Sequence, residues 1–499
     1  MLETLVASLQ YFTNPTFVGW MVAGALIGII VGIIPAIGGM ETIALFLPFT
    51  FVLRPEQALP FMVAVMATAF TGGLITAVLL GIPGDGPNIA SCLDGFPMTQ
   101  RGEGSRALAV GLLSSSLGGL ISALLCLVTI PVVLVLVYAI TSADMVFVVL
   151  LGLLCLAALS AGDVKKGLIS GGMGLLISFI GFQANTGVPR FTFGSGYLYD
   201  GVPLLPLAMG LFAMPVIIEL VTQGGEIVKG RALTVTKGMQ NVWQAARDIL
   251  RSPGVFIRGV IIGYIVGIIP GIGSMTATWV SYGQAKGTSE EGKQFGTGSV
   301  EGLIAASCAT NASVGGDLLC TLVLGIPGSA SMAIIVGGML MIGLIPGPRM
   351  LTDHTALSLS LIYVVIAGNI IGVAICLFFA PQLAKVAAIP ARILVALIVP
   401  IIFVSTFAVT QEFNDLIVLI IATILGEAMQ KFGYSRPALF MGYILGGLFE
   451  HYLFLALGTA GPLFFMRPIS LSLIGIMLAI VSYRPLKKLF IRLFSESNL

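Results

Sequence analysis

Two short phrases that combine proline with glycine recur in the two halves of this chain. Ile-Val-Gly-Ile-Ile-Pro-Ala-Ile-Gly at 30–38 returns with one substitution at 265–273, and Leu-Gly-Ile-Pro-Gly at 80–84 returns at 324–328. Proline lacks the helical N–H and its ring clashes with the preceding turn, while glycine accepts backbone conformations that other residues avoid. The sequence therefore predicts an internal duplication whose helices break at matching points.

The composition places these breaks in a membrane. Of the 499 residues, 57% are hydrophobic and 9% are charged, whereas about a quarter of the residues of a soluble domain are charged. Apolar stretches close to the roughly 20 residues that span hydrocarbon recur along the chain. We expect an all-α polytopic membrane protein with about eleven or twelve transmembrane helices. In lipid, unwound backbone survives only where it is buried in protein or lines a cavity.

Charge and cysteine usage exclude several classes of protein. The net charge is +2 and the basic residues are dispersed, which does not fit a nucleic-acid-binding protein. Six scattered cysteines and two histidines predict neither a disulfide framework nor a Cys/His metal site. Residues 1–16 contain no basic residue before the first apolar stretch, so we expect a retained first span and not a cleaved signal peptide.

A polar stretch divides the chain into its two repeats. We predict a first transmembrane repeat at 1–222, a central polar loop at 223–253, and a second repeat with C-terminal helices at 254–499. The central loop and the C-terminal tail are rich in lysine and arginine, which predicts that both are cytoplasmic. The first basic residue is Arg54, so we expect the N-terminus outside, an odd number of crossings in the first half, and an inverted second half.

The first repeated phrase has two interpretations. A proline-kinked helix with glycines for close packing would explain one copy. Because two copies occupy the same relative position and each precedes polar residues, we favour an unwound ligand site. We expect the carbonyls near Gly38 and Gly273 to hold a cation, and Thr42 and Thr276 to contact the substrate.

The second repeated phrase predicts a binding site for an anion. A helix that restarts after a break presents unpaired N–H groups and the positive end of its dipole, which suit a carboxylate. Carbonyls freed from the preceding helix suit a cation. The predicted substrate ligands are Pro83, Gly84, Asn88, Pro327, Gly328, Ser329 and Ser331.

Three acidic residues and one amide complete the predicted site. Asp85 follows an apolar stretch, and although Gly-Asp-Gly-Pro is also common in solvated turns, intramembrane ionisable residues are functional candidates. Asp85 is therefore predicted to bind the coupling cation, together with Asp317, and Glu41 is a weaker candidate. Asn311 is expected to supply a neutral oxygen to the cation.

Three further segments are given less specific interpretations. Arg101 and Arg106 either attract an anion at the site's entrance or fix the topology as a basic loop. The sequence of residues 287–294 is similar to a phosphate-binding loop, but two glutamates stand where phosphates would approach. Gln294 also replaces the Ser or Thr that binds magnesium. Residues 102–107 match a dinucleotide-binding pattern loosely, without a βαβ unit. We therefore expect no ATPase and no cofactor beyond a coupling ion.

Together these motifs resemble the large membrane subunit of the bacterial tripartite tricarboxylate transporters. The resemblance covers nearly the whole chain and rests on the phrases at 32–39, 81–85, 93–98, 325–329, 343–348, 432–434 and 467–470. Residues 449–452 depart from the family's pattern, because a more acidic and polar continuation is expected there.

The resemblance implies a secondary transporter of the bacterial inner membrane and not an enzyme. It implies a small membrane subunit of about four helices, a periplasmic binding protein that delivers a carboxylate such as citrate, and coupling to Na⁺ or H⁺. Two alternatives remain. An intramembrane aspartyl protease would pair Asp85 with Asp317 as a carboxylate dyad, although the two residues do not align between the repeats. A passive anion channel would share the broken helices and differ only in coupling.

Overall fold

The computed structural model describes residues 2–34, 37–159, 164–183, 186–222, 241–290, 292–386 and 391–480. These residues are almost entirely helical, which confirms the predicted all-α class. They gather into two compact units, one of residues 1–133 and 203–427 and the other of residues 134–202 and 428–499. Pro35, Ala36, residues 223–240 of the predicted central loop and the basic tail beyond residue 480 lie outside the described residues.

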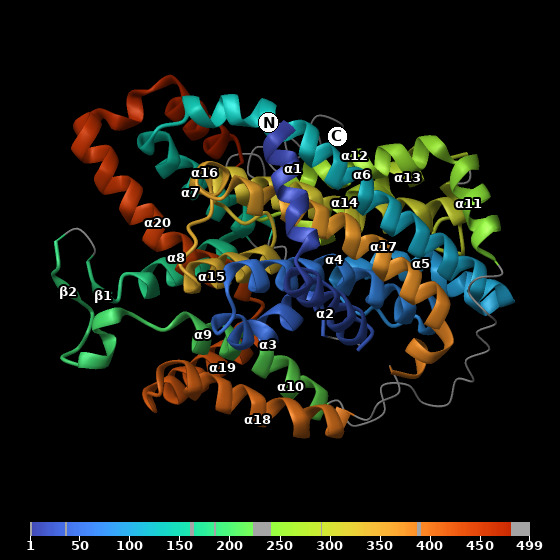
Figure 1. The fold of residues 1–499 in the computed structure, drawn as a ribbon, viewed down its shortest axis with the longest axis horizontal. Coiled ribbons are helices and arrows are strands. Elements are labelled where there is room, and N and C mark those ends of the chain that lie inside the picture. Colours follow the sequence, from blue (N-terminus) through green and yellow to red (C-terminus); the bar gives the residue numbers. More distant parts are fainter. Residues whose placement is uncertain are drawn as a thin grey trace, which may run out of the picture. The chain divides into compact units, whose positions relative to one another are not determined.

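The first unit contains most of the helices (Figure 1). In chain order they are α1 (Leu2–Gln10), α2 (Pro15–Gly32), α3 (Gly39–Phe51), α4 (Pro55–Leu80), α5 (Ile89–Met98), most of α6 (Gly104–Ala139), α9 (Leu204–Ala208), α10 (Met214–Thr222), α11 (Val242–Arg251), α12 (Pro253–Ile268), α13 (Gly273–Thr288), α14 (Val300–Leu324), α15 (Ala330–Met341), α16 (Pro348–Thr352), α17 (Thr355–Val386), α18 (Ala391–Thr410) and most of α19 (Asn414–Phe432). Short 3-10 or π turns join some of them, including η2 (Gly86–Asn88) and η3 (Thr99–Glu103).

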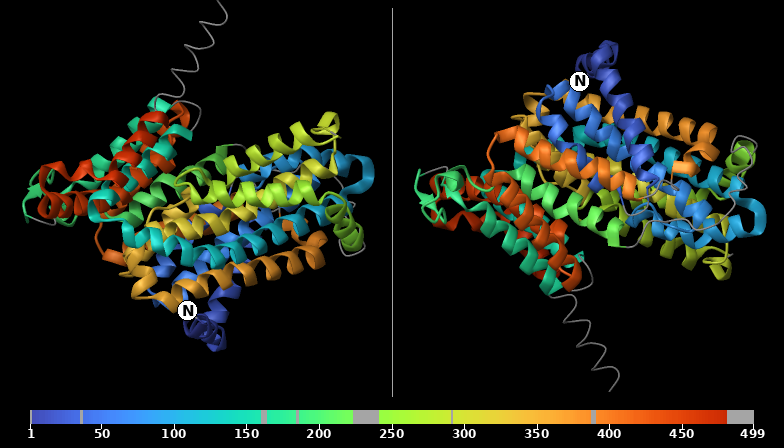
Figure 2. Two further views of the ribbon diagram at one scale, coloured as in Figure 1. Left: turned by 90° about the horizontal axis from the view of Figure 1, so that it is seen from above. Right: turned by 90° about the horizontal axis from the view of Figure 1, so that it is seen from below.

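The duplication is visible in how the helices pack. α2 lies along α4 in the first half, and α12 lies along α14 in the second (Figure 2). A Cβ on Gly28 would stand 2.7 Å from the Val65 carbonyl oxygen, and one on Gly263 would stand 2.7 Å from the Ala309 carbonyl oxygen. Glycines one turn away, at residues 24, 32 and 267, also approach a carbonyl oxygen of the partner helix, and Gly259 approaches Sγ of Cys308. Small residues thus bring each helix pair into backbone contact in the same way.

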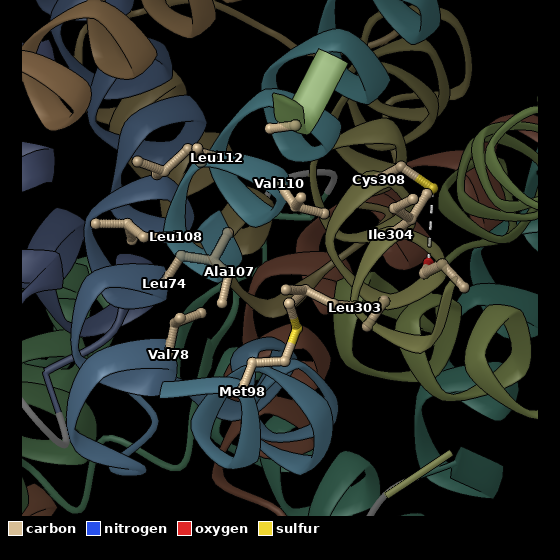
Figure 3. Packing of buried hydrophobic residues seen from close by; sticks show 14 of the residues in the cluster. Leu74, Val78, Met98, Ala107, Leu108, Val110, Leu112, Leu303, Ile304 and Cys308 are labelled. Atoms are coloured by element: carbon tan, nitrogen blue, oxygen red, sulfur yellow. Dashed lines mark hydrogen bonds between the residues drawn. The ribbon is translucent and has the colours of Figure 1, made fainter. Parts of the chain in front are cut away.

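The core of the first unit joins the two halves. Figure 3 shows apolar side chains of α4, α5 and α6 packed against those of α14. Leu74 and Val78 from the first half are fully buried, as are Leu303 and Ile304 from the second. Because α4 and α14 are equivalent helices of the two repeats, this shared core fixes one repeat against the other.

Several described helices can cross a membrane. Six are long and apolar enough: Pro15–Gly32, Pro55–Leu80, Gly86–Val133, Val300–Leu324, Thr355–Leu383 and Arg436–Met466. The pair α11 and α12, bent by 86°, would make a seventh. Shorter apolar helices include Gly39–Phe51 and Ala330–Met341, which flank the repeated phrases. The chain is therefore a multi-pass membrane protein, and the total of eleven or twelve crossings stays a prediction.

The second unit is smaller. It contains α7 (Ser142–Leu159), α8 (Val164–Ser178), a short ladder of β1 (Gly181–Phe182) with β2 (Pro189–Arg190), the turn η4 (Gly196–Asp200), α20 (Arg436–Ala460), the turn η8 (Gly461–Met466) and an apolar helix at Pro468–Ile480. Asp144 is fully buried at the start of α7 and accepts hydrogen bonds from Thr141 N at 2.9 Å and Ser470 Oγ at 2.6 Å. This carboxylate ties the C-terminal apolar helix to α7.

Candidate functional site

Both predicted helix breaks of the second phrase occur, and they have the same geometry. α4 ends in Gly81 at φ +69°, and α14 ends in Gly325 at φ +71°, the left-handed conformation that glycine adopts at helix ends. After each Ile-Pro-Gly linker the chain restarts as a helix. Asp85 caps the first restart by accepting from Asn88 N at 3.3 Å, and Ser329 caps the second by accepting from Met332 N at 3.2 Å.

The linkers pack against equivalent backbone. A Cβ on Gly84 would stand 2.5 Å from both the Gly32 carbonyl oxygen and the Cα of Gly73. A Cβ on Gly328 would stand 2.7 Å from the Gly267 carbonyl oxygen and 2.8 Å from the Cα of Asp317. Glycine is therefore required at both positions, since any side chain would meet main-chain atoms. The geometry also shows that Gly73 and Asp317 occupy equivalent places.

The first broken tip, which comprises residues 81–88, contains a hydrogen-bonded carboxylate. Asn88 Nδ2 donates to Asp85 Oδ1 at 2.9 Å and to the Phe70 carbonyl oxygen at 3.0 Å. Gly38 lies against Asp85, because a Cβ on this glycine would stand 2.8 Å from the Cβ of the aspartate, and its N–H donates to Glu41 Oε2 at 3.1 Å. Asp85 Oδ2 and Asn88 Oδ1 are buried and have no hydrogen-bond partner among the described residues.

Beside the second broken tip (residues 325–332) lies the carboxylate of Asp317, with the Ser329 hydroxyl next to it. Asp317, in α14, is fully buried, and neither of its oxygens has a hydrogen-bond partner among the described residues. The Ser329 hydroxyl lies beside this carboxylate without completing a hydrogen bond to it. Gly273 borders Ser329, and Gly271 N donates to the Pro327 carbonyl oxygen at 3.3 Å.

Each tip also contacts the other half. A Cβ on Gly86 in the first tip would stand 3.2 Å from Sδ of Met275, in the first turn of α13. A Cβ on Gly39, at the start of α3, would stand 4.0 Å from Oγ of Ser331 in the second tip. The segments after the first repeated phrase therefore meet the tips formed by the second. The fold brings together both repeated phrases from both halves, as a shared binding region requires.

The structure gives the surroundings of three further predicted residues. Thr42 donates to the Gly38 carbonyl oxygen at 2.7 Å, within its own helix. Thr276 is partly exposed in the first turn of α13. Asn311 Nδ2 donates to Thr71 Oγ1 at 3.1 Å and to Asn369 Oδ1 at 2.9 Å, while its Oδ1 is buried without a hydrogen-bond partner among the described residues. Asn311 therefore belongs to a polar cluster that joins α4, α14 and α17.

Asp94 is a buried carboxylate to which the sequence reasoning gave no role. Its Oδ1 accepts from the backbone N–H groups of residues 296, 298 and 299 at 2.8–2.9 Å, and its Oδ2 accepts from Tyr282 Oη at 2.8 Å. Asp94 thus fixes the turn that begins α14. Its place in the Leu-Asp-Gly-Phe-Pro phrase was the only available signal, because its partners lie about 200 residues away.

The basic residues near Asp94 bind other parts of the protein. Arg101 donates to the Thr297 carbonyl oxygen. Arg106 pairs with Asp248 and with Glu103, each at 2.8 Å. These contacts favour a structural role over recruitment of an anion. The loose dinucleotide pattern at 102–107 falls between η3 and α6, where a nucleotide site would require a preceding strand.

Two other motifs also have structural partners. Glu450, in the segment that departs from the family's pattern, forms a bidentate pair with Arg190 at 2.7 and 2.8 Å. Residues 292–294, from the P-loop-like segment, form a short 3-10 turn that follows α13. A P-loop would instead connect a strand to a helix.

Comparison with known proteins agrees with this architecture. A family model of the tripartite tricarboxylate transporter TctA family matches residues 18–441. An "uncharacterized 52.8 kDa protein in TAR-I ttuC' 3'region" of Agrobacterium vitis is 31% identical over 485 residues, 96% of this chain and 95% of that protein. An "uncharacterized protein in TAR-II ttuC' 3'region" of the same organism is 32% identical over 223 residues, 44% of this chain and 92% of that protein. No solved structure matches the chain. The chain belongs to the tripartite tricarboxylate transporter TctA family.

Proposed function

We propose that this chain is the subunit that carries a small organic di- or tricarboxylate, such as citrate, across the inner membrane of a bacterium. Movement of the carboxylate is coupled to a gradient of Na⁺ or H⁺. The observation that carries the proposal is the pair of equivalent broken helices, each of which contacts the other half beside a buried carboxylate. Broken helices at a repeat interface are where secondary transporters bind substrates and ions.

The two tips offer different chemical groups to the substrate and to the coupling cation. The restarting helices offer N–H groups near Pro83–Gly84 and Pro327–Gly328, and Asn88, Ser329 and Ser331 add side-chain polar groups for a substrate carboxylate. For the coupling cation, the region offers two buried carboxylates, Asp85 and Asp317, and main-chain oxygens near Gly38 and Gly273. Alternating access would then expose this region to each side of the membrane in turn.

The tripartite family implies two partners. We assign them as a small membrane subunit of about four helices, expected in this family, and a periplasmic protein that delivers the carboxylate. The binding protein would raise the local substrate concentration at the outer face. The membrane chain itself would supply the path and the coupling.

The test is uptake of labelled citrate and a panel of dicarboxylates into vesicles that contain this chain, its small partner and a matching binding protein. Accumulation that requires an imposed Na⁺ or H⁺ gradient would support the proposal. Equilibration without dependence on either gradient would indicate a passive channel. Absence of movement for every carboxylate in the panel, by a complex shown to be assembled, would contradict the assigned substrate class.

The protease alternative has a separate test. Asp85 Oδ1 is already hydrogen-bonded to Asn88, and Asp317 packs against the linker of its own half, so the contacts do not favour a shared proton. Incubation of the complex with helical membrane substrates measures any cleavage. Cleavage that disappears in the Asp85→Asn, Asp317→Asn double variant would revive this alternative.

A further inference from the structure

Each broken tip has one carboxylate, but at a different position. At the N-cap, the first half has the carboxylate of Asp85 and the second has the hydroxyl of Ser329. On the helix before the break, the first half has Gly73 and the second has the carboxylate of Asp317. Each half therefore contributes one carboxylate, but from a different element.

The first carboxylate accepts hydrogen bonds from Asn88, whereas the second has the Ser329 hydroxyl beside it. The Asn88 side chain fills the space above Gly73, where a Cβ would stand 2.5 Å from Nδ2, and that nitrogen donates to Asp85. The equivalent of Asn88 in the second half is Met332, which has no side-chain N–H. Asp317 is therefore a fully buried carboxylate to which no N–H group donates among the described residues. A charge buried in this way is costly, so the carboxylate takes either a proton or a cation.

The surroundings of Asp317 provide oxygen atoms. The Gly267 carbonyl has lost its place in the helical ladder, because Gly271 N, its usual donor, donates to the Pro327 carbonyl oxygen instead. This carbonyl oxygen and Asp317 Oδ1 both lie within 2.8 Å of the point where a Cβ of Gly328 would stand. The Ser329 hydroxyl lies beside the same carboxylate. One carboxylate with neutral oxygens is a donor set for a hard cation of single charge.

We propose that the second half alone binds the cation, as one sodium-like ion held by Asp317, the Ser329 hydroxyl and the Gly267 carbonyl, while Asp85 acts as a helix cap. This inference rests on the proposed function and specifies its coupling site. The same ion neutralises Asp317 beside the N-terminus of α15, where a substrate carboxylate would otherwise meet a negative charge. The cation therefore binds before the substrate.

The experiment measures binding of ²²Na⁺ to the purified chain in detergent, without substrate or partners. We expect saturable binding to the wild type, no saturable binding to Asp317→Asn, and a dissociation constant within about twofold of the wild type for the matched control Asp85→Asn. Ser329→Ala, which keeps the carboxylate, is expected to weaken binding by about tenfold or more, as loss of supporting groups does at other ion sites. Gel filtration and the apparent melting temperature check that each variant is folded.

Three results would overturn the assignment. They are absence of saturable Na⁺ binding to the wild type, retained binding in folded Asp317→Asn, and equal loss of binding in Asp85→Asn. If Asp317→Asn does not fold, Ser329→Ala decides, because unchanged affinity in that variant contradicts the site. The assay needs no carboxylate, so it separates failure of this ion site from failure of the proposed substrate class.

Discussion

The side-chain Nδ2 of Asn88 donates a 2.9 Å hydrogen bond to Oδ1 of Asp85, and the backbone N–H of the same asparagine donates to that oxygen at 3.3 Å. Asp85 therefore has the geometry of an N-cap, the same role that Ser329 has in the second half. The two caps differ in charge but perform the same local task, which gives a direct way to separate capping from ion binding.

Replacing Asp85 by alanine removes the cap and both hydrogen bonds from Asn88. We expect loss of gradient-driven uptake with normal membrane insertion, and destabilisation of about 1 kcal/mol, the usual cost of a lost cap. Asp85→Ser restores a cap without a charge and should recover most of the uptake. Transport and apparent melting temperature are measured on both variants. Loss of uptake in a stable Asp85→Ser variant would mean that the charge itself is needed.

The glycine contacts between α2 and α4 predict a position-specific packing effect. A Cβ on Gly28 would stand 2.7 Å from the Val65 carbonyl oxygen, so Gly28→Ala must push the helices apart, at a cost of about 1–3 kcal/mol. A Cβ on Gly19 of the same helix would have no atom within 4 Å. Gly19→Ala should therefore be neutral or slightly stabilising. Thermal unfolding in detergent compares the two, and equal effects would refute close packing at Gly28.

The sequence was sufficient to predict features that proline and glycine determine locally. The breaks after Leu80 and Leu324 were predicted because these residues act on their own turn of helix, and the internal repeat predicted that the breaks would match. The equivalence of Asp85 with Ser329 followed from the same alignment and is confirmed by their matching caps.

The partners of polar side chains could not be predicted in this way. Asn88 reaches Phe70, and Asn311 reaches Asn369, only after helices distant in sequence have packed. For the same reason, the sequence could not predict that the Asn311 amide would meet Thr71 and Asn369. Tertiary packing decides which polar group of another helix each of these side chains meets.

Asp94 is expected to be a large contributor to stability. Asp94→Ala would leave three backbone N–H groups and the Tyr282 hydroxyl without their acceptor in a buried site. Stranding donors to a charged group should cost on the order of 3 kcal/mol or more. Tyr282→Phe removes a single hydrogen bond and should cost about 1 kcal/mol. Unfolding measured in detergent ranks the two variants, and a smaller loss for Asp94→Ala would contradict its clamping role.

The ion pair between Arg106 and Asp248 decides between the two interpretations of the basic segment. Its nitrogen and oxygen are 2.8 Å apart, and Asp248 is almost fully buried. If Arg106 only supports the fold, then Arg106→Gln and Asp248→Asn should each destabilise the protein, and the double variant should lose less than the sum, with a coupling energy of about 1 kcal/mol. The KM for carboxylate uptake should be unchanged in both.

If Arg106 instead attracts the anion, Arg106→Gln should raise KM, while Asp248→Asn, which removes one of its two acidic partners, should lower it. Uptake measured at matched protein amounts distinguishes these patterns, because stability changes alone alter the number of active molecules and not KM.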